Sequence, residues 1–209
     1  MSVGDQVNLL ISLLALANPL GNLPLFLALT QSEAVARRHR IALVSGLAMF
    51  VTLALAYWLG LAVLAAFSIS LAAFGLGAGL IILLYGLVMV RAPEALLGYR
   101  GGQPGALEQR SPALVPLAIP LLAGPGSIAR VMIARYHHTT LAAGLGATLV
   151  ILVAAAFTVL VLYYADTLNR RVGAAGVSAV SRILGMLLMA VGFMGLAEAL
   201  QRIWPALAG

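Results

Sequence analysis

The 209-residue sequence contains no cysteine and no lysine, and only 9% of its residues are charged. Without cysteine, disulfides and thiolate metal sites are excluded. So little charge excludes an ordinary soluble domain, in which about a quarter of the residues are charged. The sequence also lacks a phosphate-binding glycine loop, a Gly-x-Ser-x-Gly elbow and a His-Glu-x-x-His pair, which are common signatures of enzymes. We therefore expect no enzyme, no metal site and no cofactor.

Apolar residues make up most of the chain. They account for 63% of the sequence, and the mean hydropathy is +1.08. A transmembrane helix needs about 20 mostly apolar residues, and six segments qualify: 7–30, 41–66, 71–91, 113–134, 139–165 and 178–204. We therefore expect an all-α, multi-pass integral membrane protein with six transmembrane helices in contact with the lipid bilayer.

The arginines predict how the chain is oriented. Nine arginines lie in or beside loops one, three and five, counting Arg182 at the mouth of the last span, and three lie on the other side. Because basic residues are enriched in cytoplasmic loops, we expect both termini outside the cytoplasm. This distribution explains the positive charge, so we do not expect nucleic-acid binding. The first apolar run has neither a positive region before it nor an Ala-x-Ala-like cleavage site, which predicts a retained span.

The two halves of the chain share a constant offset of 106 residues. This offset relates Asn18 to Gly124, Gly79 to Gly185 and Gly86 to Gly192. One offset across three apolar segments indicates an internal duplication. We therefore divide the chain into a first three-helix repeat (1–91), a cytoplasmic linker (92–112) and a second three-helix repeat (113–209). Since three is an odd number of spans, the second repeat is expected to be inverted relative to the first.

Proline interrupts the first and fourth spans. The first contains Asn18-Pro19-Leu20-Gly21-Asn22, and the fourth contains Gly124-Pro125-Gly126-Ser127. Proline removes a backbone donor and clashes with the carbonyl four residues earlier, so both helices are expected to break. At ~1.5 Å per residue, both breaks fall near the middle of a ~30 Å hydrocarbon core. Half-helices are expected to begin near Gly21-Asn22 and near Gly126-Ser127.

These breaks form the predicted binding site. The first amides of a helix are unsatisfied and carry positive partial charge, so two helix N-termini at one depth suit a carboxylate. Freed carbonyls and asparagine oxygens can accept hydrogen bonds from an ammonium group. This predicts a small zwitterionic substrate, bound by Asn18, Pro19, Gly21, Asn22, Gly124, Pro125, Gly126 and Ser127. The alternative is that Asn18 and Asn22 only repair backbone groups freed by proline, and that Ser127 is a plain N-cap.

Three charged residues near the ends of the spans are candidates for gating. Arg130 and Glu198 are expected at the same outer level, where they could pair across the site. Alternatively, Arg130 extends its charge to the interface and Glu198 pairs with Arg202, four residues later on the same helix. Arg182, near the inner mouth, is either part of an inner gate or a positive anchor at the cytoplasmic face.

Three stretches of this sequence resemble one protein family. They are Ala17–Phe26, Val115–Ile128 with its Ala123-Gly124-Pro125-Gly126-Ser127, and Ser181-Arg182-Ile183-Leu184-Gly185. Together they resemble the MarC family of bacterial inner-membrane proteins, which includes SnatA-type small neutral amino acid transporters. The resemblance covers nearly the whole chain. It implies six spans, a location in the inner (plasma) membrane and transport of small neutral amino acids.

The residues and the resemblance together predict a secondary transporter for small neutral amino acids such as glycine, alanine and serine, working by alternating access. The alternatives are a non-transporting membrane scaffold or regulatory protein, and an efflux pump for other small molecules. The sequence leaves open whether the protein exports or imports, whether H⁺ or Na⁺ is the coupling ion, and whether it forms a homo-oligomer.

The arrangement of the arginines gives a testable topology. Tags at both termini should be accessible from outside the cell, and a tag within residues 101–105 should be accessible only from the cytoplasm. The measurement is labelling of the tags in intact and in permeabilised cells. A cytoplasmic C-terminus would contradict the inverted repeat, which requires an odd number of spans in each half.

Overall fold

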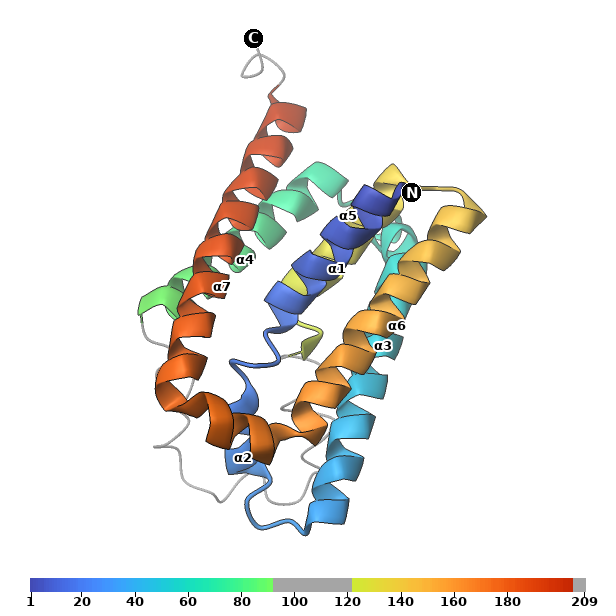
Figure 1. Ribbon diagram of the computed structural model, residues 1–209. Helices are drawn as coiled ribbons and strands as arrows, with labels where there is room; N and C mark the ends of the chain where they lie inside the picture. Colours follow the sequence, from blue (N-terminus) through green and yellow to red (C-terminus); the bar gives the residue numbers. More distant parts are fainter. Residues whose placement is uncertain (92–121, 205–209) are drawn as a thin grey trace.

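The computed structural model describes residues 1–91 and 122–204. Within these ranges the chain folds into seven helices and no strand (Figure 1). The helices are α1 (Val3–Ala17), α2 (Leu23–Leu29), α3 (Val35–Ala66), α4 (Leu71–Arg91), α5 (Pro125–His137), α6 (Leu141–Tyr163) and α7 (Ala165–Ile203). The expected linker 92–112 and the start of the fourth expected span, 113–121, lie outside the described residues.

Four stretches are long and apolar enough to cross a membrane, namely α3, α4, α6 and Ser178–Ile203 of α7. They correspond to the expected spans 41–66, 71–91, 139–165 and 178–204. Large apolar side chains such as Leu43, Leu47 and Leu149 are more than half exposed on α3 and α6. Such faces are unfavourable in water and suit contact with lipid. The first expected span, 7–30, is divided into α1 and α2.

The polar segments between spans 7–30 and 41–66 and between spans 139–165 and 178–204 were expected to be loops. In both cases this expectation was wrong, because most of each segment is helical. Helix α3 already begins at Val35, so Arg37 and Arg38 lie in its first turns. Likewise Asp166 lies in the first turn of α7. Arginine favours helix, and polarity alone does not distinguish a loop from an exposed helical turn. An ion pair of 2.6 Å between Arg38 and Asp166 joins the two segments.

Helix α7 changes direction at Gly173. Its φ of +66° and ψ of 169° are not helical, and glycine adopts this conformation without strain. As Figure 1 shows, the chain before Gly173 runs across the lower end of the bundle, and the chain after it runs along the bundle towards the C-terminus. The N-terminus lies at that same upper end. The start of α1 and the end of α7 therefore lie at the same end of the helix bundle.

Two hydrophobic clusters hold the helices together. The larger one joins α1, α2, α3, α5 and α6, and contains fully buried side chains such as Phe26, Met49 and Leu162. The smaller one joins the last turn of α1 to α4 and α7 through Leu16, Ile82 and Leu188. The end of α1 therefore lies where the two clusters meet.

Helices α4 and α7 pack through glycine. A Cβ atom at Gly86 would lie 2.6 Å from the carbonyl oxygen of Gly185, and a Cβ at Gly185 would lie 2.8 Å from the carbonyl oxygen of Gly86. Gly79 and Gly192 make the same reciprocal contact, at 3.0 and 2.9 Å. The 106-residue offset relates these two contacts, because it maps Gly79 onto Gly185 and Gly86 onto Gly192. Close backbone approach of this kind replaces the hydrophobic driving force that lipid does not supply.

This packing predicts the effect of adding one methyl group. Gly86→Ala should lower the free energy of unfolding by about 1–3 kcal/mol, because the new Cβ meets backbone that must shift. Gly77→Ala is the matched control on the same helix, since a Cβ there meets nothing within 4 Å. It should be neutral or stabilising by up to about 1 kcal/mol. Thermal unfolding in detergent micelles measures both, and equal effects would contradict the packing argument.

Candidate functional site

The first helix break is centred on Asn18. Helix α1 ends at Ala17, and Asn18 caps it in the left-handed conformation, with φ 39° and ψ 58°. Pro19 has no N–H, so the helix cannot continue and the carbonyl of Ala15 loses its helical donor. Asparagine is the residue after glycine that best tolerates this conformation. Its Oδ1 also accepts a hydrogen bond of 3.1 Å from the Gly21 N–H.

Asn22 completes the break. It occupies the N-cap of α2, but its side chain makes no capping bond. Instead its Nδ2 donates a hydrogen bond of 2.9 Å to the carbonyl oxygen of Ala17. Asn18 and Asn22 are both almost completely buried. These contacts correspond to the second interpretation of the two asparagines, in which they satisfy backbone groups at the break.

The second break lies at the start of α5. The helix begins at Pro125 with Gly124 as its N-cap, and the N–H of Ile128 makes the first backbone bond, of 3.1 Å, to the carbonyl of Gly124. The interpretation of Ser127 as an N-cap was therefore wrong, since it lies inside the first turn. Its side chain is only 2% exposed.

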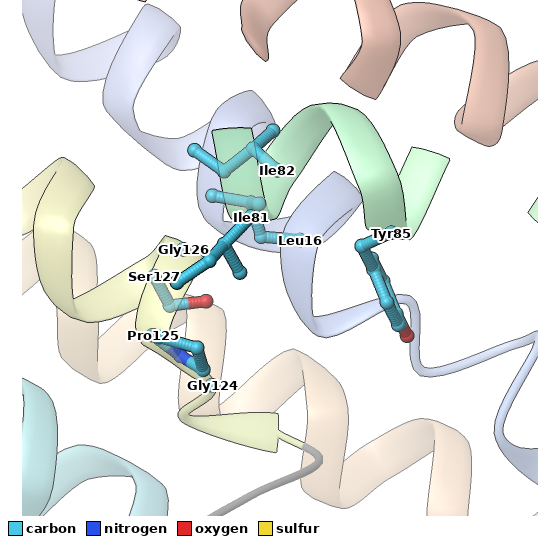
Figure 2. Close-up of a pocket in the computed structure, with 8 residues that line it drawn as sticks. All are labelled: Leu16, Ile81, Ile82, Tyr85, Gly124, Pro125, Gly126 and Ser127. Carbon is cyan, nitrogen blue, oxygen red and sulfur yellow. The ribbon is translucent and has the colours of Figure 1, made fainter. Parts of the chain in front are cut away.

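A cavity of about 130 Å³ opens beside this first turn. Its described lining consists of Leu16 from α1, Ile81, Ile82 and Tyr85 from α4, and Gly124, Pro125, Gly126 and Ser127 around the start of α5 (Figure 2). Gly126 lets the three helices meet, because a Cβ there would lie 2.8 Å from Cγ1 of Ile82 and 2.9 Å from Cδ2 of Leu16. The four predicted site residues of the second half thus lie around one cavity.

The four predicted residues of the first half do not line this cavity. All four, Asn18, Pro19, Gly21 and Asn22, follow Leu16 in the chain, and Asn18 and Gly21 lie close to α4 and α7 respectively. A Cβ at Gly21 would lie 2.7 Å from Oγ of Ser181, and Nδ2 of Asn18 lies 4.0 Å from Sδ of Met89. Position along the chain predicts depth in the membrane, but it does not predict which side of the helix faces a cavity.

The polarity of the cavity follows from two helix ends. The amides of Gly126 and Ser127 belong to the N-terminal turn of α5, which carries positive partial charge. Leu16 belongs to the last turn of α1, whose carbonyls carry the opposite partial charge. Two N-termini were expected to converge here, but the cavity is lined by one N-terminus and one C-terminal turn. Helix α2, whose N-cap is Asn22, contributes no described lining residue.

Sequence reasoning missed Tyr85. Its hydroxyl is buried and has no hydrogen-bond partner within the described residues, and it lines the cavity. A signal was available in the sequence, because Tyr85 and Arg91 are the only residues of the span 71–91 whose side chains carry a nitrogen or oxygen atom. A polar side chain in the middle of an apolar span is a candidate for function by default.

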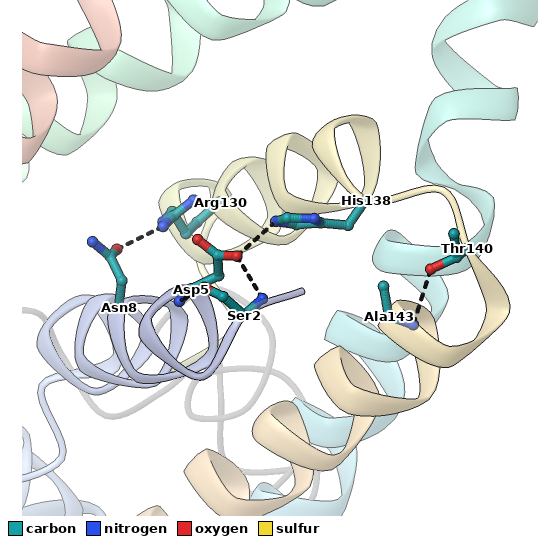
Figure 3. Close-up of polar contacts among 7 residues, drawn as sticks. All are labelled: Ser2, Asp5, Asn8, Arg130, His138, Thr140 and Ala143. Carbon is teal, nitrogen blue, oxygen red and sulfur yellow. Dashed lines mark hydrogen bonds and ion pairs between the residues drawn. The ribbon is translucent and has the colours of Figure 1, made fainter.

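The outer ends of α1 and α5 are joined by polar contacts (Figure 3). Arg130 donates a hydrogen bond of 2.8 Å to Oδ1 of Asn8, and Nε2 of His138 lies 3.6 Å from Oδ2 of Asp5. The backbone N–H of Ser2 donates to Asp5 at 2.7 Å and lowers the pKa of that carboxyl. The two helices on either side of the cavity are therefore also held together at their far ends.

The other gating candidates remain apart. Glu198 is exposed, and within the described residues it makes no ion pair shorter than 4 Å. The alternative in which Glu198 pairs with Arg202 is not observed, because Arg202 instead contacts Nε2 of His137 at 3.3 Å and lies 5.3 Å from the ring centre of Tyr136. Arg182 is exposed on α7. The structure leaves the gating role of all three residues as a prediction.

Comparison with known proteins matches the chain to one family of membrane proteins. The sequence model described as "MarC family integral membrane protein" matches residues 5–204. A UPF0056 membrane protein of Methanocaldococcus jannaschii, MJ1677, is 34% identical over 86% of this chain and 88% of its own length. YvbG of Bacillus subtilis is 29% identical over 96% of each chain, and YhcE of Escherichia coli is 29% identical over 94% of this chain and 92% of its own. No solved structure matches the chain.

The conformation of Asn18 predicts an unusual order of stability for two variants. Asn18→Gly should unfold less easily than Asn18→Ala, by about 1–2 kcal/mol, because only glycine adopts the left-handed conformation without strain. Asn169, in a regular part of α7, is the control, and there alanine should be the better residue by about 1 kcal/mol. Thermal unfolding in detergent measures both pairs. The same order at both positions would contradict the observed cap.

Proposed function

The chain belongs to the MarC family of integral membrane proteins, and from this premise we propose that it is a secondary transporter of small neutral amino acids. The substrate site is the cavity between α1, α4 and α5. The names of the relatives state only that they are membrane proteins, so the cavity itself has to support the proposal. We take its polarity, its size and the symmetry around it in turn.

The meeting of two opposite helix ends carries this proposal. Leu16, in the last turn of α1, and Gly126, in the first turn of α5, are in contact at the cavity wall. A carboxylate is favoured at the N-terminal turn, and an ammonium group is favoured near carbonyls that have lost their helical donors. A zwitterion satisfies both ends at once. Ser127 lines the cavity, and its hydroxyl offers a further donor to the carboxylate.

The size and charge of the cavity restrict the substrate. A cavity of about 150 Å³ holds a molecule the size of benzene, so the 130 Å³ observed here accommodates a ligand of roughly that size. Glycine, alanine and serine meet this limit, while tryptophan does not. No charged side chain is among the described lining residues, so a net cation or a dianion would have no counter-charge and would carry a desolvation penalty.

The arrangement of the helices supports alternating access. The constant offset pairs α2 with α5, α3 with α6 and α4 with α7. Helix α3 contacts α6, and α4 contacts α7. The reciprocal glycine contacts of α4 and α7 are those expected of two helices related by a two-fold axis. Inverted repeats around a midplane site are a common plan of secondary transporters, in which one helix group moves against the other.

The two alternative functions explain these features less well. A non-transporting scaffold or regulatory protein has no need for a cavity at a helix break. An efflux pump for bulky compounds needs a larger cavity than the one observed.

The proposal predicts that Gly126→Val abolishes transport. The added methyl groups would occupy the space between Ile82 and Leu16 and block the start of α5. Counterflow of labelled alanine in proteoliposomes containing only this protein measures the effect. Gly77→Val makes the same chemical change on α4, away from the cavity, and should transport normally.

Competition in the same assay tests the substrate class. Unlabelled glycine and serine should compete with labelled alanine, while lysine, glutamate and tryptophan should not. Normal transport by a correctly folded Gly126→Val variant would contradict the site. Stronger competition by lysine or by an aromatic compound than by unlabelled alanine would contradict the substrate class.

A further inference from the structure

Tyr85 has a polar group that the packing of the protein does not use. Its hydroxyl is buried and unpartnered within the described residues. Buried polar groups nearly always have a hydrogen-bond partner, so each exception calls for an explanation. Here the explanation is available in the surroundings, because the side chain lines the cavity proposed to hold the substrate.

The position of Tyr85 relates it to a definite part of the substrate. Figure 2 shows Tyr85 on the opposite side of the cavity from Ser127 and the first turn of α5. Between them the wall is formed by apolar side chains, Ile81, Ile82 and Leu16. A ligand whose carboxylate binds at α5 would therefore place aliphatic carbon against this wall and the end of its side chain near Tyr85.

The chemistry of the Tyr85 phenol indicates which group of the substrate can bind to it. A neutral tyrosine hydroxyl both donates and accepts one hydrogen bond, which matches another hydroxyl. It carries no charge to balance an ammonium group, for which the carbonyls at the end of α1 are better partners. An apolar side chain of the same size would leave the Tyr85 hydroxyl unpaired.

We infer that Tyr85 is a specificity-determining residue of this cavity, and that it selects small neutral amino acids with a side-chain hydroxyl over amino acids of equal size without one. This inference rests on the function proposed above. It goes beyond that function because it predicts a difference between substrates of the same size and net charge. Sites built to pair a substrate hydroxyl discriminate against analogues that lack it more strongly than purely apolar pockets do.

The test compares serine with α-aminobutyrate, which has a methyl group in place of the hydroxyl and is otherwise the same size. Both compete against labelled alanine in proteoliposomes containing wild-type protein or Tyr85→Phe. In the wild type, serine should compete better than α-aminobutyrate. In Tyr85→Phe this preference should fall by about two- to tenfold, the value of one neutral hydrogen bond. The KM for serine should rise while kcat changes little.

Tyr57→Phe is the matched control. Tyr57 on α3 also has a buried hydroxyl without a hydrogen-bond partner among the described residues, but it does not line the cavity. Its substitution removes the same atom from a buried tyrosine on another helix, beside Arg135, and should leave the preference for serine unchanged. An equal loss of preference in both variants would show that the effect does not come from the cavity, and would overturn the inference.

The remaining outcomes separate this inference from the function on which it rests. If alanine and serine are both transported and Tyr85→Phe keeps the wild-type preference, the inference is overturned and the proposed function stands. If Tyr85→Phe does not fold, the wild type alone decides, because equal competition by serine and α-aminobutyrate overturns the inference. If the wild type exchanges neither alanine nor serine, the proposed function itself is overturned.

Discussion

Inside the hydrocarbon core of a bilayer, a backbone amide or carbonyl has no water to bind, so each one needs a partner within the protein. The two proline breaks create such groups in the middle of this chain. At the first break, Asn18 and Asn22 supply the partners, through bonds to Gly21 and Ala17. At the second break, the first turn of α5 opens onto a cavity instead. Similar interruptions thus have two different outcomes, one closed by hydrogen bonds and one beside a cavity.

This difference gives the two halves of the chain different tasks. The residues around the first break pack tightly, with Gly21 against Ser181 of α7, and they fix where α1 ends. The residues around the second break line the cavity, among them Ser127 and the first turn of α5. Leu16 links the two, because it belongs to the last turn of α1 and also lines the cavity. The closed break at the end of α1 therefore supports the position of the cavity at the start of α5.

The glycine contacts between α4 and α7 help to position the cavity wall, although these glycines do not line the cavity. They bring the two backbones close and place Ile81, Ile82 and Tyr85 of α4 opposite the start of α5. In lipid, helices gain little from burying apolar surface against each other, so close packing and hydrogen bonding must hold them together. The cavity wall therefore depends on residues that never touch it.

The sequence by itself determined the helical class, the membrane environment and both breaks, because hydropathy and proline act locally on the backbone. It placed α4 at its observed limits, and it grouped Gly124 to Ser127, which line one cavity in the structure. Only the tertiary structure decided that Asn18 and Asn22 face away from the cavity, and that Tyr85 faces into it. The reason is that rotation of a helix about its axis is set by packing against its neighbours, and a span such as 71–91 with one polar residue in its middle does not indicate what that residue faces.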